Sequence, residues 1–302
     1  MKGVWLPFDP AHLGEVPADL HVEVFDKTGE MPSSAAEVEF YVPDYTFSRR
    51  VLEVIPQLPR LRVVQSLTAG VEHITPYLRD GVTLCNARGV HNTSTAELAV
   101  TLTLSSLRGI PQFVRAQDRG EWAFAMYPSL ADRTVLIVGY GEIGAAIERR
   151  LVPFECDVLR VARTARDGVA GLDALPELLG RADVVIVVVP MTDQTRGMVD
   201  ATFLAALKNG ALLVNVSRGA VVDTDALLAE LSSGRLRAAL DVTDPEPPPP
   251  GHPLWSAPGL LLSPHVGGGS TAFWPRAYAL VQRQLTRFAA GEPLDNVMSG
   301  DY

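Results

Sequence analysis

The stretch TVLIVGYGEIGAAIERRL, Thr134–Leu151, begins as a short apolar strand, passes through a glycine-rich turn and continues as a helix. A Gly-x-Gly-x-x-Gly turn between a strand and a helix is typical of a dinucleotide-binding unit. Gly139 permits the tight turn, Gly141 lets the backbone approach a pyrophosphate, and Gly144 lets the helix lie close to the strand. The first helical turn adds N–H groups and the positive end of a dipole. We therefore predict a nucleotide cradle rather than a turn with incidental glycines.

The next strand pattern, CDVLRVAR, indicates which dinucleotide is bound. In an NAD enzyme an Asp or Glu about 20 residues after the glycines binds the ribose 2′-hydroxyl. Here the strand ends in Ala162 and Arg163, followed by Thr164 and Arg166. A planar guanidinium cannot accept the hydroxyl protons, but it suits a 2′-phosphate. We favour NADP(H) over NAD(H) as the cofactor; the alternative is that Arg163 is a solvated surface charge.

Length and composition limit the class of protein. The chain has 302 residues, of which 47% are hydrophobic and 20% charged, as in a globular protein with a substantial core. Its net charge of −9 gives no reason to expect a nucleic-acid partner. Cys85 and Cys156 are far apart and lack the spacing of a metal site or a disulfide scaffold. With no membrane-length apolar run and no signal-like N-terminus, we expect a soluble, cytoplasmic protein without a membrane or metal partner.

Two strand-and-helix series follow one another along the chain. The first has apolar runs near Val22, Val38, Leu61 and Val82. An uninterrupted helix is expected over Ser94–Arg108, with Ser94 as its cap and Glu97 completing a capping box. The second series predicts strands at Val135–Val138, Val158–Val161, Val184–Val189, Leu212–Val216, Arg237–Asp241 and Leu260–Ser263. A last helical pattern, Ala277–Ala290, is expected to cross back to the first series, so that the first domain is discontinuous.

Polar residues follow the last three strands of the second series. Arg218 lies just past one strand, Glu246 lies in the loop after the next strand, which ends at Asp241, and His265 lies just past the last strand. Ligands of open α/β sheets bind at the carboxyl ends of strands. A histidine with a carboxylate partner can transfer protons near neutral pH, and an arginine can hold a substrate carboxylate. Taken singly, each residue has an ordinary structural or surface explanation; their joint position after a nucleotide cradle favours catalysis.

The runs NVSRGAVVDTDALLAEL, DVTDPEP and SPHVGG, after GYGEIG, resemble those of the D-isomer-specific 2-hydroxyacid dehydrogenases over essentially the whole chain. The resemblance implies an α/β fold of two Rossmann-like, doubly wound parallel-sheet domains. The dinucleotide-binding domain, residues 94–270, would be inserted into a discontinuous substrate domain, residues 1–93 and 271–302. It further implies reduction of a small 2-keto acid, similar to glyoxylate or hydroxypyruvate, to the D-2-hydroxy acid with NAD(P)H.

The same resemblance implies roles for individual residues. Arg218 would bind the substrate carboxylate and carbonyl, His265 would donate the proton, and Glu246 would hold His265. Ala69, Gly70 and Val71 would form a backbone nest for the substrate carboxylate. The residues expected at the cofactor are Gly139, Tyr140, Gly141, Glu142, Ile143, Gly144, Arg163, Thr164, Arg166, Pro190, Thr195, Val216, Ser217, Asp241, His265, Gly267 and Gly268. Asp241 would contact the nicotinamide carboxamide or support the His–Glu pair.

Three features depart from the commonest family pattern or leave alternatives open. Thr243 stands where many members have Phe, and Asp244 is a competing carboxylate beside Glu246. The arginine at position 163 is a feature in which the sequence resembles the NADPH-dependent glyoxylate/hydroxypyruvate reductases.

Two alternative functions stay open. They are an NAD-linked enzyme such as phosphoglycerate dehydrogenase, and a dinucleotide-sensing protein without turnover. The family also suggests a homodimer formed through the cofactor domain, with Trp122–Leu130 as part of an arm.

Overall fold

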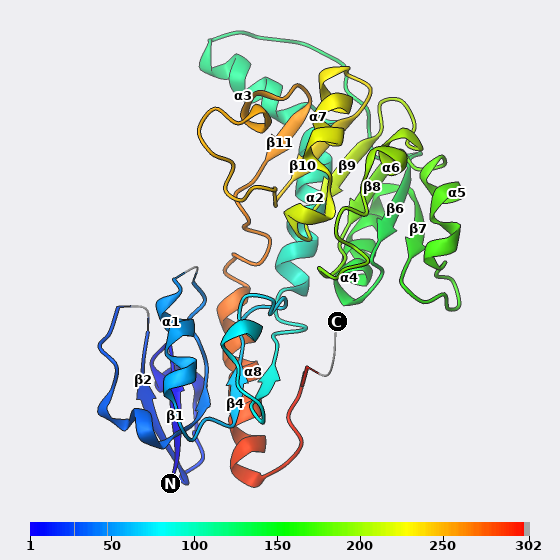
Figure 1. The fold of residues 1–302 in the computed structure, drawn as a ribbon. Coiled ribbons are helices and arrows are strands. Elements are labelled where there is room, and N and C mark those ends of the chain that lie inside the picture. Colours follow the sequence, from blue (N-terminus) through cyan, green and yellow to red (C-terminus); the bar gives the residue numbers. More distant parts are fainter. Residues whose placement is uncertain (27, 47, 299–302) are drawn as a thin grey trace. The chain divides into compact units, whose positions relative to one another are not determined.

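The computed structural model describes residues 1–298 apart from 27 and 47, so residues 299–302 of the predicted substrate domain lie outside the described residues. The chain divides into two compact units, each with its own parallel sheet (Figure 1). One unit contains Met1–His91 and the chain from Thr271 onward, and the other contains Asn92–Ser270. The dividing points fall after residues 91 and 270, compared with 93 and 270 in the sequence analysis.

The first unit has a five-stranded sheet in the order β2-β1-β3-β4-β5, with every pair of strands parallel. Its strands are β1 (Lys2–Leu6), β2 (Leu20–Val24), β3 (Val38–Tyr41), β4 (Val63–Gln65) and β5 (Thr83–Cys85). Strand β1, which pairs with both β2 and β3, was not among the predicted strands. Because β1 is buried along most of its length, it lacks the polar–apolar alternation that marks a strand with one solvated face.

The last long helix, α8 (Phe273–Ala290), belongs to this first unit (Figure 1). Lys2 Nζ donates to the carbonyls of Phe288 and Ala289 at 3.1 and 2.7 Å, and the Phe288 ring lies 5.1 Å from that of Phe40. This helix therefore packs on the first unit, which is discontinuous in sequence. Its short helices are α1 (Arg50–Glu53), η1 (Pro10–Leu13), η2 (Ser33–Glu37), η3 (Ile55–Gln57) and η4 (Thr75–Tyr77).

The second unit has a six-stranded parallel sheet in the order β11-β10-β9-β8-β6-β7. Its strands match the predicted ones to within two residues: β6 (Thr134–Val138), β7 (Asp157–Val161), β8 (Val184–Val187), β9 (Leu212–Asn215), β10 (Arg237–Leu240) and β11 (Leu260–Leu262). The chain runs outward from β6 in one direction to β7 and in the other to β8 and beyond. This reversal is the topological switch point at which doubly wound sheets bind ligands. Both units confirm the predicted α/β fold.

Helices cover both faces of the second sheet. Val135 and Ile137 of β6 face a core shared with α2 (Asn92–Leu107) and α4 (Glu142–Leu151). Leu136 and Val138 face the opposite core, shared with α5 (Leu175–Leu179), α6 (Ala201–Ala205) and α7 (Thr224–Ser232). The remaining helices are α3 (Ile110–Asp118), η5 (Val152–Phe154), η6 (Leu172–Ala174), η7 (Gly219–Val221) and η8 (Pro253–Ser256). Burial on both faces explains the continuous apolar runs of these strands.

The start of α2 differs from the sequence prediction. The helix begins at Asn92 rather than after Ser94, and Ser94 is buried inside its first turn. Its hydroxyl lies 2.6 Å from that of Ser270. The predicted capping box was therefore wrong, because the Ser94 hydroxyl bonds to a distant loop instead of the helix backbone.

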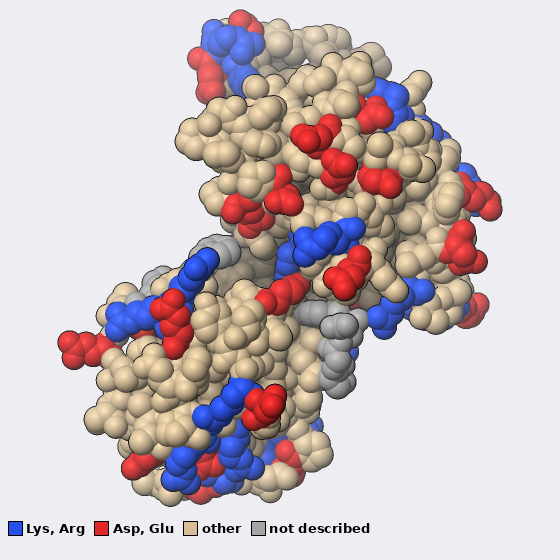
Figure 2. All heavy atoms as spheres, viewed as in Figure 1, with Lys and Arg blue, Asp and Glu red and all other residues tan. Residues whose placement is uncertain are grey.

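Acidic and basic side chains lie interspersed over the face of the molecule that is shown in Figure 2. Among the described helices, none is both long and apolar enough to cross a membrane. The predicted subcellular location stays a prediction.

A hydrogen bond between two buried glutamine side chains holds α8 to the first sheet, and we expect its loss to lower stability. Gln284 donates to Gln65 Oε1 at 2.6 Å, and both side chains are fully buried. Gln284→Leu would leave that oxygen without its donor, which should lower the free energy of unfolding by about 2 kcal/mol. The measurement is the urea midpoint. Thr286→Leu, on the exposed side of the same helix, is the control and should shift the midpoint little; equal shifts would contradict the prediction.

Candidate active site

The glycine turn after β6 has the geometry expected of a nucleotide cradle. Gly139 has φ +103°, and a Cβ there would lie 2.4 Å from the Val188 carbonyl oxygen, so both backbone conformation and space require glycine. At Gly144 a Cβ would lie 3.0 Å from the Gly139 oxygen and 3.3 Å from Ile137, which shows how closely α4 approaches β6. The turn therefore brings the start of α4 directly over the switch point.

Gly141, the N-cap residue of α4, leaves room for a ligand. Apart from Gly141 itself and its two chain neighbours, no atom of the described residues lies within 4 Å of a Cβ built on Gly141. Since glycine has no side chain to cap the helix, the first-turn N–H groups of α4 remain directed toward this space. Asn92 donates to Glu142 at 2.9 Å and so ties α2 to the same turn. This open cradle fits the pyrophosphate of a dinucleotide.

The loop after β7 carries the expected cofactor-discriminating residues. Arg163, Thr164 and Arg166 are all exposed. Reciprocal backbone hydrogen bonds between Arg166 and Val169 close the loop, at 3.0 and 2.8 Å. Arg166 also donates from Nη2 to the Tyr140 carbonyl oxygen. The loop after β7 and the glycine turn are thus in direct contact.

The loop after β8 is compact and internally bonded. Thr195 Oγ1 donates to the Pro190 carbonyl at 2.6 Å and accepts from Thr192 N at 2.9 Å. Val189 lies beside the glycine turn, since its Cγ1 is 2.9 Å from a Cβ built on Gly139. Thr195 therefore shapes the loop that faces the cradle.

Arg218 and Ser217 lie in a loop that is organised by Asn215 at the end of β9. Asn215 Oδ1 accepts from the backbone and hydroxyl of Ser217 at 3.0 and 2.6 Å, and Nδ2 donates to the Arg218 carbonyl at 2.9 Å. A Cβ on Gly219 would lie 1.8 Å from the Thr243 carbonyl oxygen. Only glycine allows this approach, which places the loop after β9 against the loop after β10. Val216, also expected at the cofactor, is buried at the start of the same loop.

His265 pairs with Glu246. Their Nδ1 and Oε1 atoms lie 2.5 Å apart, and both side chains are about one-third exposed, at 33% and 35%. Burial raises the pKa of the Glu246 carboxyl, but the hydrogen bond and charge of His265, with smaller contributions from Thr243 N–H and Arg218, lower it overall. Glu246 is therefore held as a carboxylate. At the competing residue, Asp244, Thr224 Oγ1 donates to the backbone carbonyl at 2.7 Å.

The backbone of His265 is strained, and Asp241 holds it. His265 has φ +53°, a conformation that residues with a Cβ rarely adopt. Its N–H donates to the Asp241 carbonyl at 2.8 Å. The Asp241 carboxylate, on a residue only 2% exposed, accepts from Ser263 Oγ at 2.6 Å, and from Val266 N and Gly267 N at 2.9 and 2.7 Å. These bonds hold the backbone on both sides of His265, and the two roles expected for Asp241 stay predictions.

The glycines after His265 are fastened to α2. Thr95 Oγ1 donates to the Gly267 carbonyl at 3.2 Å, close to the bond between Ser94 and Ser270. Gly267 is buried and Gly268 is half-buried. The start of α2 thus sets the path of this loop.

The expected carboxylate nest lies in the first unit, after β4. Asn86 Nδ2 donates to the Ala69 carbonyl at 3.0 Å, and Thr68 Oγ1 donates to the Gly70 carbonyl at 2.6 Å. Val71 is buried, and its carbonyl accepts from Ile74 N at 2.9 Å. These bonds fix the orientation of the peptide groups from Ala69 to Val71.

Several residues that build the site were absent from the sequence analysis. Asn215 and Ser263 each lie two residues before another polar residue of a quoted motif, in NVSR and SPH, and this spacing is the signal that could have found them. Thr95 gives no such signal, because its contact with Gly267 spans 172 positions. Within the second unit the structure brings Arg218, Asp241, Glu246 and His265 onto adjoining loops at the carboxyl edge of the sheet.

Comparisons with known proteins agree with this architecture. Residues 100–267 match the family model described as "D-isomer specific 2-hydroxyacid dehydrogenase, NAD binding domain". The chain is 30% identical over 301 residues to the glyoxylate reductase/hydroxypyruvate reductase of Homo sapiens, covering 92% of this chain and 90% of the relative.

Solved structures show the same similarity over nearly the full length. A D-isomer specific 2-hydroxyacid dehydrogenase from Xanthobacter autotrophicus Py2, in complex with NADPH and MES, has a TM-score of 0.81 at 30% identity, with 98% of this chain and 97% of that chain covered. The NADPH-dependent glyoxylate/hydroxypyruvate reductase of Sinorhizobium meliloti, in complex with NADP and malonate, has a TM-score of 0.79 at 28% identity, with 98% and 96% covered. The chain belongs to the D-isomer specific 2-hydroxyacid dehydrogenase family.

Proposed function

We propose that this protein reduces a small 2-keto acid, of the size of glyoxylate or hydroxypyruvate, to the D-2-hydroxy acid with NADPH as the preferred donor. The observation that carries the proposal is the His265–Glu246 pair, held at the sheet edge by Asp241 and adjoining the Arg218 loop. Relatives named as glyoxylate or hydroxypyruvate reductases support the substrate class.

In the proposed mechanism, His265 gives a proton to the developing alkoxide. Because Nδ1 is hydrogen-bonded to the Glu246 carboxylate, the proton would leave from Nε2. The Glu246 carboxylate, bonded to Nδ1, fixes the orientation of the ring. Arg218 would hold the substrate carboxylate and stabilise the developing oxyanion, and the N–H groups of Ala69, Gly70 and Val71 would bind the carboxylate as well.

The cofactor would be held by the glycine turn and the two loops beside it. When bound, its nicotinamide supplies the hydride that reduces the keto carbon. Gly141 and the start of α4 fit its pyrophosphate, and Pro190 and Thr195 would line the adenosine half. The exposed Arg163, Thr164 and Arg166 suit a 2′-phosphate. Structural neighbours in complex with NADPH or NADP support this preference.

We also propose a homodimer formed through the second unit. After α3, the side chains of Trp122, Phe124 and Met126 are 98%, 84% and 90% exposed. Tyr127 anchors the end of this segment, with its ring 5.3 Å from that of Phe113 and against Gly109. Apolar side chains exposed to this extent are typical of a surface covered by a partner. A second copy of the chain is the partner that fits the sequence prediction.

The first test is the initial rate of NADPH and NADH oxidation with glyoxylate, hydroxypyruvate, pyruvate and a bulkier 2-keto acid. Charge-assisted hydrogen bonds to a 2′-phosphate should make kcat/KM at least about 10-fold higher with NADPH. A preference for NADH would overturn the role of Arg163 and leave the dehydrogenase function standing. Tight cofactor binding without turnover would instead identify a dinucleotide-sensing protein.

Replacing His265 tests the proton donor. His265→Asn is the appropriate variant, since Asn tolerates the positive φ at this position. We expect kcat to fall by about 10²–10⁴-fold, with the Kd for NADPH almost unchanged. His21→Asn, a half-exposed histidine of the first unit, is the control. Undiminished kcat in His265→Asn would remove His265 from the acid role.

Polar substitution of the exposed segment tests the dimer. The triple variant Trp122→Ser, Phe124→Ser, Met126→Ser should sediment as a monomer, whereas the unmodified chain should sediment as a dimer. Val152→Ser, which alters a side chain 71% exposed at a different site, should leave the dimer intact. A monomeric unmodified chain would contradict the proposal.

A further inference from the structure

Arg166 is exposed, and its side chain is folded back onto the glycine turn. Its Nη2 donates to the Tyr140 carbonyl oxygen, and its guanidinium carbon lies 5.8 Å from the centroid of the Tyr140 ring. A cation at this distance is attracted by the face of the ring. Tyr140 therefore contacts Arg166 twice, through its backbone and through its side chain.

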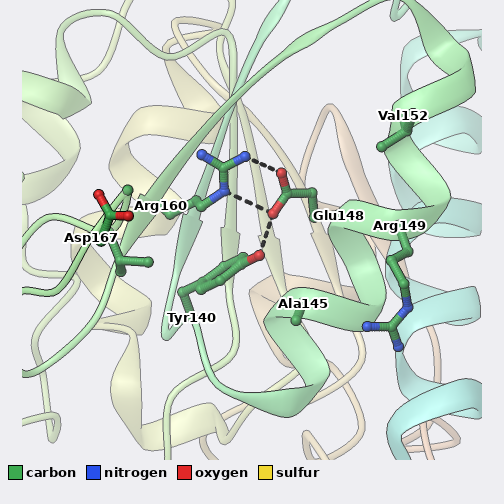
Figure 3. Close-up of a pocket in the computed structure, with 9 residues that line it drawn as sticks. Tyr140, Ala145, Glu148, Arg149, Val152, Arg160 and Asp167 are labelled. Atoms are coloured by element: carbon green, nitrogen blue, oxygen red, sulfur yellow. Dashed lines mark hydrogen bonds and ion pairs between the residues drawn. The ribbon is translucent and has the colours of Figure 1, made fainter.

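The Tyr140 ring is in turn held by an ion pair between α4 and β7 (Figure 3). The Tyr140 hydroxyl donates to the Glu148 carboxylate, and Arg160 donates to the same carboxylate from Nε, at 2.8 Å, and from Nη2. The Glu148 side chain is only 15% exposed. The hydrogen bonds of Arg160, despite partial burial, hold the pKa of Glu148 below its usual range, so it is an ionised acceptor for Tyr140.

Apolar packing holds only one side of this ring, which lies against the core of the second unit. Tyr140 lines a cavity of about 460 Å³ together with Ala145, Glu148 and Arg160 (Figure 3). A side chain beside such a space lacks packing partners on that side. On that side the ring is held by the bond between its hydroxyl and Glu148.

The two arginines that flank the ring differ in whether a carboxylate of the described residues pairs with them. Arg160 is neutralised by its two-pronged pair with Glu148. Among the described residues, Arg166 forms no ion pair, and it is exposed next to the turn that fits the pyrophosphate. Its charge is thus available to an anion, at a position set by Tyr140.

We propose that Tyr140 is a specificity-determining positioning residue: fixed by Glu148, it holds Arg166 beside the glycine turn to receive the 2′-phosphate of the cofactor. The inference rests on the proposed function, because it requires that NADP(H) be the ligand. It adds that discrimination against NAD(H) depends on a residue inside the glycine motif as well as on the arginines after β7.

The experiment compares binding of adenosine 2′,5′-bisphosphate and adenosine 5′-monophosphate, by titration calorimetry, to the full chain and its variants. Tyr140→Phe removes only the hydroxyl, and Tyr140→Leu removes the ring face. We expect the Kd for the 2′,5′-bisphosphate to rise about 3–10-fold in Tyr140→Phe and further in Tyr140→Leu, while the Kd for the 5′-monophosphate stays constant. Arg166→Ala sets the maximum effect. The KM for NADPH should rise in parallel, with the KM for NADH unchanged.

Arg149→Gln is the matched control. Arg149 lines the same cavity, but the described residues show no hydrogen bond or ion pair between it and Tyr140, Glu148 or Arg160. Its loss should leave the ratio of the two Kd values unchanged. Urea midpoints of all variants establish that they are folded.

The outcomes separate the inference from the function on which it rests. A loss confined to the 2′,5′-bisphosphate supports the role of Tyr140. An equal loss for both ligands, or a preference that survives both Tyr140 variants, would overturn the inference and leave the NADP preference intact. An unmodified chain that binds both ligands equally would overturn the NADP preference itself, and the inference with it.

Discussion

The buried carboxylate of Asp241 is the constraint on which the candidate site depends. It stands at the end of β10 and accepts hydrogen bonds from Ser263, Val266 and Gly267, the residues that surround His265. A positive φ at a residue with a Cβ costs of order 1 kcal/mol or more and persists only where surrounding bonds outweigh it. Those bonds come from Asp241, so the direction in which His265 presents its ring toward Glu246 follows from one buried side chain.

Close backbone contacts at two glycines hold the neighbouring loops of the site together. Gly219 lies against the Thr243 carbonyl, and Gly139 lies against Val188. A methyl group at either position would push apart two loops that follow adjacent strands. Because the sheet order places β6 next to β8 and β9 next to β10, these contacts draw the cradle and the Arg218 and Glu246 loops to one edge. The strand order determines which loops are neighbours, and the glycines allow those loops to approach each other closely.

Much of this architecture could be predicted from the sequence, and the errors have physical causes. Strands that are buried on both faces appear in the sequence as apolar runs bounded by glycine, proline or charged residues. The bounds of β6 to β11 were therefore predicted to within two residues. The same property hid β1, which has no flanking turn signal on its N-terminal side. Ser94 was misassigned because a serine before an apolar run reads as a cap, whereas its partner, Ser270, lies 176 positions away. Motifs located Arg218, Glu246 and His265, and the family resemblance offered support of the His–Glu pair as one of two roles for Asp241. No local pattern could show that Asp241 binds Ser263, Val266 and Gly267.

The contacts of the arginines in and after β7 could not be predicted from the sequence. Arg160, Arg163 and Arg166 stand within seven positions of one another, and the sequence shows only that Arg160 lies inside the predicted strand and the other two past its end. The fold shows what they contact, because β7 directs Arg160 onto Glu148 of α4, whereas the loop beyond directs Arg166 onto the glycine turn. The carboxylate of Glu148 largely cancels the field of Arg160, whereas Arg166 at the turn forms no ion pair among the described residues. The preference for a phosphorylated ribose would thus depend on which arginines the helix beside the cradle has already neutralised.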